Sequence, residues 1–242
     1  MPRFFTDSAV GDEIIISGQD AAHISRSLRM SCGEEIILCD GKGTDYFCTI
    51  SEITSDSVTA HIESSQSSQG EPDVEVLLFQ GLPKSDKMDL IVQKSVELGV
   101  NSVIPFIATR SISRPDDKSA SKKADRWQKI ASEAAMQSHR GIIPQVMPIT
   151  SFADSLKIAS ECDCIIVFYE GGGLPLKTVL LEPKPSRIAI FIGPEGGLDE
   201  SDVSAIETIG GKCATLGKRI LRTETAPLAA ITSIMLLTDN MN

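Results

Sequence analysis

Two glycine-bearing segments near the end of the chain combine residue types and spacing suited to binding a small ligand. The first has the sequence IGPEGG over residues 192–197, and the second runs from Leu216 to Pro227. Each lies between an apolar strand and the start of a helix. Glycines in such positions let a ligand approach backbone N–H and C=O groups directly. One glycine would more often indicate a tight turn, but three glycines and a matching second segment favour a pair of ligand-binding loops.

The elements that must position these loops alternate between strands and helices from Val74 onwards. Strands are expected at 74–80, 102–106, 164–168 and 187–192, and helices at 86–98, 122–138, 156–161, 199–208 and 225–237. This alternation predicts a parallel α/β sheet. Asp199 is a good N-cap and Asp202 adds a carboxylate to the first turn, so the helix after the first loop has a well-specified start. The helix at 225–237 is apolar almost all round, which indicates burial on several sides.

The first 68 residues have a different pattern. Short strand-like runs at 13–16, 34–38 and 46–50 are separated by turn residues, which predicts a small β-barrel. Residues 64–72 are polar and flexible, as expected of a linker. We therefore expect two domains, at 1–70 and 71–242.

The charge balance is unfavourable for a nucleic-acid partner, since 23 basic residues face 33 acidic ones, for a net charge of −10. A local exception is the stretch 109–140, which carries eight basic and four acidic side chains. This stretch could form a basic face, although a solvated amphipathic helix would have the same composition.

Composition also bounds the location and the chemistry. No window has eighteen uninterrupted apolar residues and no signal peptide is apparent, so a cytoplasmic protein without a membrane span is expected. The six cysteines form no C-x-x-C pair and have no accompanying histidine cluster, so reduced thiols and no metal site are predicted. The motifs of phosphate-binding loops, zinc proteases, dinucleotide-binding folds and α/β-hydrolases are missing.

Several strings of the chain, in this order, resemble one known family. They are Ala22-His23 with Leu28-Arg29, Leu82-Pro83-Lys84 with residues 88–94 (MDLIVQK), residues 97–100 (ELGV), residues 126–140 (RWxxIAxEAAxQSxR), residues 192–197 (IGPEGG) and residues 216–226 (LGxRILRTETA). Each string alone is weakly specific, but the ordered set is highly specific. The chain resembles the bacterial 16S ribosomal RNA uridine-N3 methyltransferases, the RsmE family of the SPOUT class.

The resemblance implies a PUA-like β-barrel followed by an α/β methyltransferase domain tied in a trefoil knot, working as a homodimer. It implies transfer of a methyl group from S-adenosylmethionine to N3 of a uridine near the decoding region, in 16S rRNA or the assembled small ribosomal subunit. The residues implied to bind the cofactor are Tyr169, Glu170, Ile192, Gly193, Gly197, Leu216, Gly217, Ile220, Leu221, Arg222, Thr225 and Ala226.

Methylation at N3 requires that a weakly acidic proton be removed and that charge on the uracil oxygens be stabilised. Arg222 is the candidate for the second task, with a structural hydrogen-bonding role about equally compatible with its position. No residue is a convincing general base. The residues expected to contact RNA are Arg3, His23, Arg26, Arg29, Lys84, Arg110, Gln137 and Arg140.

Glu133, Gln137 and Arg140 recur at helical spacing and are expected near one helix face. Members of the family usually carry a glutamate where this chain has Met136. Two alternatives stay open from the residues: a non-catalytic RNA-binding protein of the same architecture, and a small-molecule α/β enzyme whose glycine loops bind another nucleotide.

Overall fold

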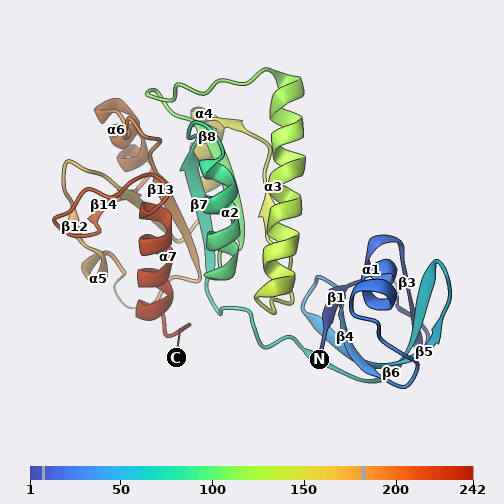
Figure 1. Ribbon diagram of the computed structural model, residues 1–242. Coiled ribbons are helices and arrows are strands. Elements are labelled where there is room, and N and C mark those ends of the chain that lie inside the picture. Colours follow the sequence, from blue (N-terminus) through green and yellow to red (C-terminus); the bar gives the residue numbers. More distant parts are fainter. Residues whose placement is uncertain (7–8, 181–183, 242) are drawn as a thin grey trace. The chain divides into compact units, whose positions relative to one another are not determined.

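The chain forms two compact units in the computed structural model, which describes residues 1–6, 9–180 and 184–241 (Figure 1). The first unit contains residues 1–71 and 135–143, and the second contains residues 72–134 and 144–242. The sequence analysis sets its boundary one residue earlier and does not include 135–143 in the first unit. That segment returns to the first unit far along the chain, which no local pattern could indicate.

The first unit is a six-stranded sheet with the order β1-β4-β5-β6-β3-β2. Its strands are β1 (Arg3–Phe5), β2 (Ala9–Val10), β3 (Glu13–Ser17), β4 (Glu35–Cys39), β5 (Thr44–Ile53) and β6 (Ser57–Ser67). Neighbouring strands are antiparallel, except that β1 and β4 are parallel. A helical segment, α1 (Gly18–Ala22) continuing into η1 (His23–Ser27), follows β3.

The core of this unit follows from strand alternation. In β3, Ile14 and Ile16 are buried while their neighbours are exposed, as a sheet with one solvated face requires. Met136 packs against the same core, so an apolar side chain suits this position. The predicted linker begins too early, because residues 64–67 belong to β6 and pair with residues 44–47 of β5. Their polar side chains do not prevent pairing, which uses backbone groups alone.

The second unit is built on a parallel sheet with the order β10-β8-β7-β13-β11-β14-β12, and β9 pairs with β8. Its strands are β7 (Glu75–Gly81), β8 (Ser102–Ile107), β9 (Gln145–Val146), β10 (Thr150–Ser151), β11 (Cys164–Phe168), β12 (Leu174–Pro175), β13 (Arg187–Ile192) and β14 (Lys212–Thr215). The four predicted strands are confirmed as β7, β8, β11 and β13, with small changes at their ends.

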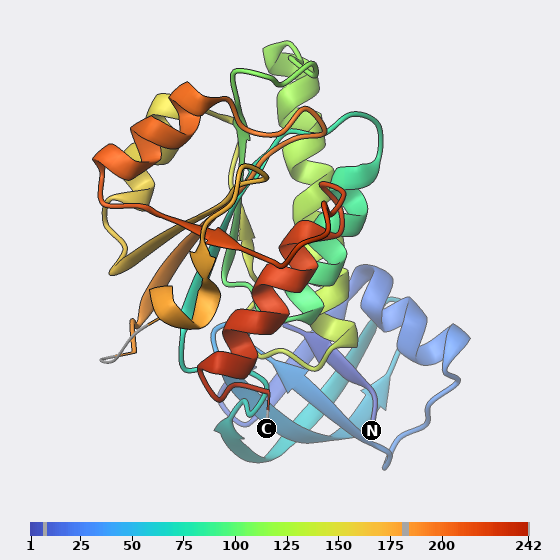
Figure 2. The same ribbon diagram turned by 90° about the vertical axis from the view of Figure 1, so that its left-hand side faces the viewer.

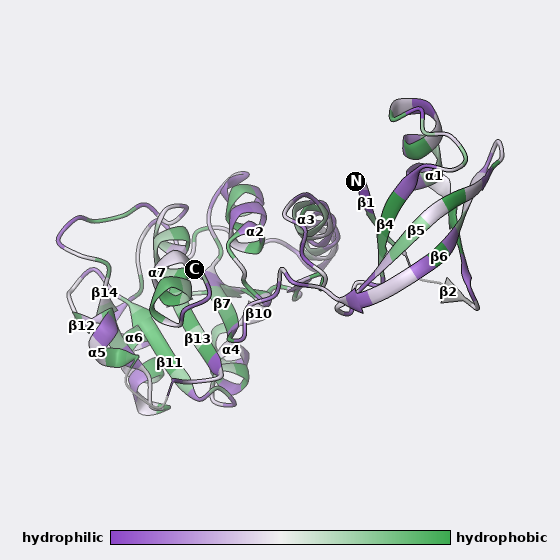
Figure 3. Cartoon of the chain, turned by 90° about the horizontal axis from the view of Figure 1, so that it is seen from below, coloured by the Kyte–Doolittle hydropathy of each residue, from purple (hydrophilic) through white to green (hydrophobic). Residues whose placement is uncertain are grey.

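Helices cover both faces of this sheet, which explains why its central strands β11 and β13 are apolar along their length (Figure 3). Helices α2 (Lys87–Glu97) and α7 (Ala226–Leu237) cover one face, and α4 (Phe152–Ala159) and α6 (Glu200–Thr208) cover the other. Figure 2 shows α7, in red, on the viewer's side. On the α4 and α6 face, the rings of Phe79 and Phe191 stack with centroids 4.5 Å apart.

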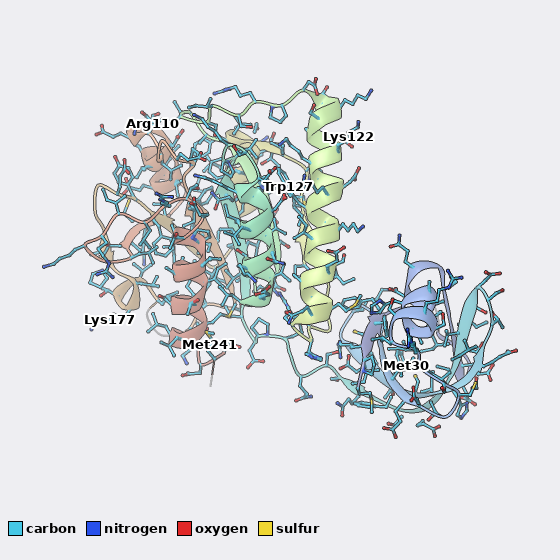
Figure 4. The ribbon with its side chains drawn as sticks, viewed as in Figure 1. Met30, Arg110, Lys122, Trp127, Lys177 and Met241 are labelled. Carbon is cyan, nitrogen blue, oxygen red and sulfur yellow. The ribbon has the colours of Figure 1, made fainter. Side chains whose placement is uncertain are left out.

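The remaining helices are α3 (Asp117–Gln137) and the short α5 (Leu176–Val179). Helix α3 starts five residues before its predicted start and ends at Gln137, so Arg140 lies beyond the helix that was predicted to carry it. Within the second unit, Trp127 projects from α3 toward α2 and donates a hydrogen bond from Nε1 to Asp89, while Lys122 points away (Figure 4).

Two further expectations can be compared with the structure. All six cysteines are free thiols, as predicted, and burial raises the pKa of Cys48, Cys162 and Cys213 to about 11. Among the described residues, no helix has the length and apolar character needed to cross a membrane. The trefoil knot stays a prediction.

Candidate active site

A pocket of the second unit opens at the carboxyl ends of three neighbouring strands. The last residues of β11 and β13 are paired, Phe168 with Ile192, and Phe168 also pairs with Ala214 of β14 on its other side. All three residues line a cavity of about 740 Å³. Ligands of parallel α/β sheets bind at this edge, because loops leaving neighbouring strands meet there.

The first glycine loop, residues 193–198, connects β13 to α6. Its turn is closed by a hydrogen bond from the N–H of Gly197 to the carbonyl of Pro194, 2.9 Å long. Gly197 has a φ of +70°, and a Cβ on Gly193 would lie 2.8 Å from the backbone of Gly197. Both positions therefore require glycine. The following helix starts at the predicted N-cap, Asp199, which forms a capping box with Asp202 and so fixes the end of the loop.

The second glycine loop connects β14 to α7 and is tied to the first by a buried side chain. The hydroxyl of Thr223 donates to the carbonyl of Gly193 at 2.7 Å and accepts from Nε2 of Gln80 at 3.0 Å. Gln80, at the end of β7, is fully buried and also donates to the carbonyl of Gly81. The two loops are thus connected by buried hydrogen bonds at the pocket.

The structure brings together the residues predicted to bind the cofactor. All of them line the cavity except Thr225, which is exposed immediately before α7. The sequence analysis did not assign the other lining residues. They are Lys87, Phe168, Gly171, Gly172, Pro194, Glu195, Leu198, Ala214, Thr215, Lys218, Arg219 and Thr223. Most of them adjoin predicted residues in the same loops, whereas Lys87 comes from α2, which only the fold brings to the pocket.

Charged side chains from three segments meet at this pocket. Nζ of Lys87 lies 3.1 Å from Oε1 of Glu195 in the first loop and 3.3 Å from Oε2 of Glu224 in the second. The backbone N–H of Lys84 also donates to Glu195. Arg222 is 84% exposed, with its guanidinium 4.0 Å from Glu224. Arg222 therefore has freedom to move, whereas Lys87 is held on two sides.

Contacts within this cluster shift the pKa values of Lys87 and Glu195. The pKa of Lys87 is raised, first by its hydrogen bond to Glu195 and then by its interactions with Glu224. Burial alone would raise the pKa of Glu195, but hydrogen bonds from its own backbone, Lys87 and Lys84 lower it below its ordinary value. Both shifts favour the charged forms, so the Lys87 ammonium and the Glu195 carboxylate form an ion pair at the pocket.

The lining fits a nucleoside with a polar tail. Apolar side chains, among them Ile192, Leu216 and Ile220, can contact a flat base, while loop backbone groups can pair with its edge. Glu170 follows β11, and its carboxylate lies close to Gly197, since a Cβ there would be 3.0 Å from Oε1. A carboxylate at such a strand end is suited to accept hydrogen bonds from ribose hydroxyls.

Two of the residues predicted to contact RNA are buried in the first unit. The guanidinium of Arg3 makes two hydrogen bonds to Asp45, 2.6 and 2.7 Å long, and a third to the carbonyl of Arg140. The side chain of Arg140 is 2% exposed and pairs with Glu71 at 2.6 Å. As placed, neither guanidinium is accessible to RNA, and both hold the segment 135–143 on the barrel.

The other predicted RNA contacts are exposed. His23, Arg26, Arg29 and Gln137 lie on the surface of the first unit. Lys84 and Arg110 lie on the second unit, where Arg110 pairs with Asp199 at 3.1 Å and donates to the carbonyl of Gly196 in the first glycine loop. Arg110 therefore supports the pocket wall as well as presenting positive charge beside it.

Comparisons with known proteins agree with both units. Residues 70–235 match the family model described as an RNA methyltransferase domain, and residues 16–63 match the one described as an RNA methyltransferase PUA domain. Ribosomal RNA small subunit methyltransferase E of Bacillus subtilis is 39% identical over 230 residues, which cover 93% of this chain and 90% of the relative.

Solved structures extend this similarity to the whole fold. Ribosomal RNA small subunit methyltransferase E of Neisseria gonorrhoeae, bound to S-adenosylmethionine, is 33% identical with a TM-score of 0.88 over 98% of each chain. A Legionella pneumophila protein in complex with the same cofactor is 25% identical with a TM-score of 0.86 over 97% of this chain and 96% of that one. The chain therefore belongs to the RNA methyltransferase family that includes ribosomal RNA small subunit methyltransferase E.

Proposed function

We propose that this protein transfers a methyl group from S-adenosylmethionine to N3 of a uridine in 16S rRNA, near the decoding region of the small ribosomal subunit. The observation that carries the proposal is the pocket between the two glycine loops, which gathers eleven of the twelve residues predicted to bind the cofactor. Its relatives with the same fold bind S-adenosylmethionine or are named as methyltransferases of small-subunit RNA.

The chain's own residues suit the reaction. S-adenosylmethionine supplies, when bound, an electrophilic methyl group on a sulfonium. The glycine loops orient that ligand through backbone groups, and the buried Gln80–Thr223 contact keeps the two loops fixed relative to each other. Arg222 lines the pocket with an exposed guanidinium, which can donate to uracil oxygens where negative charge develops.

Binding of RNA would use the basic side chains that are exposed on the surface of each unit. On the first unit these are Arg26 and Arg29, with His23 beside them, and on the second unit Lys84 and Arg110. The net charge of −10 repels RNA phosphates at long range, so these local basic groups must supply the attraction for RNA.

We further propose that the protein is a homodimer. Helix α7 ends with two apolar side chains that are exposed, Leu236 at 58% and Leu237 at 40%. Paired helix ends would cover these side chains. Light scattering on the purified chain would give twice the chain mass of 26.0 kDa; the mass of a single chain would exclude the dimer.

The direct test of the reaction is mass spectrometry of nucleosides and fragments from 16S rRNA of cells with and without the gene. The proposal predicts an N3-methylated uridine near the decoding region that disappears on deletion and returns when the wild-type gene is restored. An unchanged methylation pattern would overturn the proposal. RNA binding without any methylation would instead identify a non-catalytic RNA-binding protein.

A further inference from the structure

We propose that Lys87 is a catalytic residue of this pocket, whose ammonium stabilises the negative charge on the uracil while its N3 is methylated. The inference rests on the proposed function, because it needs a uracil at the pocket. It differs from the sequence analysis, which assigns this task to Arg222 and gives Lys87 no role.

The position of Lys87 comes from the fold. Lys87 is the first residue of α2, at the end of the connection from β7, and its side chain lines the pocket with the two glycine loops. Glu195 and Glu224 approach its Nζ from one loop each, at 3.1 and 3.3 Å. Three separate segments of the chain therefore converge on one ammonium group.

The contacts leave the ammonium able to act. An ammonium has three N–H donors, and the two carboxylates occupy two directions around it. The side chain is 34% exposed, so it is neither sealed in the core nor free in solvent. A donor fixed in advance stabilises developing charge better than a mobile one, since it needs no reorganisation during the reaction. Arg222, at 84% exposed, lacks such fixation.

The charges around Lys87 keep its side chain protonated, so it acts as a cation and not as a base. Besides Glu195, the charged residues that line the pocket with Lys87 are Glu170, Lys218, Arg219 and Arg222. Arg222 lies 4.0 Å from Glu224, and Asp89 on α2 pairs with Arg126 and Trp127. Because its two carboxylate partners raise its pKa, Lys87 stays protonated throughout the neutral and mildly alkaline range. It therefore cannot accept the N3 proton, but it can lower the pKa of that proton.

Methyl transfer to N3 requires loss of the N3 proton and displacement at the methyl carbon. The N3–H bond breaks and its proton passes to water, which leaves negative charge on the uracil oxygens beside the ammonium. The N3 electron pair attacks the methyl carbon, and the carbon–sulfur bond breaks with its electrons remaining on sulfur. Stabilising the anion reduces the need for a strong base.

The partners of Lys87 explain its placement. Oε2 of Glu224 is buried and accepts no hydrogen bond from the described residues. In this part of the chain its charge is balanced by the ion pair with Lys87. Glu195 is fixed by the N–H of Lys84 as well as by Lys87. Both carboxylates therefore orient the ammonium.

The test is single-turnover methyl transfer from radiolabelled S-adenosylmethionine to small ribosomal subunits from cells lacking the gene, measured between neutral and alkaline pH. K87M removes the charge and retains most of the side-chain length. We expect its rate at neutral pH to fall about 100-fold or more, as when a donor to a developing anion is removed. We also expect its rate to reach a plateau at a higher pH than that of the wild type.

The pH profile separates catalysis from structure. If Lys87 lowers the pKa of N3, the loss is largest at neutral pH and shrinks as the pH rises, whereas a merely structural defect reduces the rate by one factor at every pH. K87R, which keeps the charge, should recover part of the rate and the wild-type profile. K94M is the matched control, because Lys94 lies on the same helix, pairs with Glu97 and does not line the pocket.

Two results would overturn the inference. One is a K87M rate within threefold of the wild type, and the other is an equal loss at all pH values while K87M still binds S-adenosylmethionine in calorimetry. A wild-type protein that methylates no uridine would defeat the proposed function first, and that outcome is visible in the wild-type arm alone.

Discussion

In the first unit the guanidinium groups of Arg3 and Arg140 are buried against Asp45 and Glu71, whereas in the second unit the charges of Lys87 and Arg222 remain open at a pocket. Each buried arginine pairs with a carboxylate, and Arg3 also donates to a backbone carbonyl. Lys87 also has two carboxylate partners, but about a third of its side-chain surface remains exposed. The difference separates charges that hold segments together from charges that can meet a ligand.

The buried pairs explain how a distant segment joins the barrel. Glu71 accepts from Arg140 and from the N–H groups of Gly141 and Ile142, while Arg3 reaches both Asp45 and the carbonyl of Arg140. One connected network thus fixes residues 140–142. Because such groups are satisfied only as a set, removing one leaves its partner buried and unpaired.

The largest expected effect is therefore on stability, for Asp45→Ala. Leaving Arg3 buried without its partner should cost the first unit about 3–5 kcal/mol of unfolding free energy. Hydrogen exchange of the β4 and β5 amides under increasing urea would measure it. Glu52→Ala, on the exposed surface of β5, is the control and should change stability by less than about 0.5 kcal/mol. An equally small effect of Asp45→Ala would contradict the structural role of the network.

The same pair predicts a pH dependence. Burial alone would raise the pKa of Asp45, but hydrogen bonds from Arg3 and Ser68 lower it below its ordinary value. Its stabilising contribution is then present above the pKa of the unfolded carboxyl, near 3.8, and is lost as the pH falls through the lower folded value. Asp45→Asn should reduce this acid sensitivity of the first unit.

A smaller effect is expected at the pocket from Thr223→Val. The substitution keeps the side-chain shape but removes two hydrogen bonds. The carbonyl of Gly193 loses the donor Thr223 Oγ1, and Nε2 of Gln80 loses it as an acceptor. At about 1–3 kcal/mol for unsatisfied buried groups, affinity for S-adenosylmethionine should fall roughly tenfold or more in calorimetry. Thr208→Val, on the exposed surface of α6, should leave the affinity unchanged. Unchanged binding by Thr223→Val would show that the two loops do not need this contact.

The smallest effect on folding is expected from the exposed arginines. Arg26→Ala combined with Arg29→Asn, chosen because Arg29 has a φ of 55° that asparagine tolerates, should change stability by about 0.5 kcal/mol or less. Affinity for ribosomal RNA should fall, and the dependence of log K on log salt should become shallower by about one to two. If the salt dependence stays the same, these arginines do not contact phosphates.

Strand–helix alternation and loop composition made much of the second unit predictable. Apolar runs predicted the four central strands, and Asp199 with Asp202 predicted the start of the helix after the first loop, because both depend on short-range rules. The glycine-rich composition of the two loops predicted a ligand site, and the family resemblance named the residues that would line it. Edge strands such as β9, β10 and β12 are two residues long, too short to leave a pattern.

The roles of several charged residues could not be predicted from the sequence, because they depend on long-range contacts. Arg3 and Arg140 have the residue type of RNA contacts, and only their burial against Asp45 and Glu71 shows another role. Lys87 lies in an ordinary helix start, and its meeting with Glu195 and Glu224 requires loops more than a hundred residues away. A charge pattern along the chain does not distinguish these situations, because partners separated by such distances leave no periodic signal.

The most direct test of the central idea is calorimetric titration of the wild-type chain and of Gly193→Val with S-adenosylmethionine. A side chain on Gly193 would meet the backbone of Gly197, so the variant distorts the first loop, while Ser204→Val adds similar bulk on an exposed face of α6. The account predicts one site per chain in the wild type and in Ser204→Val, and little or no binding in Gly193→Val. No binding by the wild type, or equal binding by Gly193→Val, would contradict it.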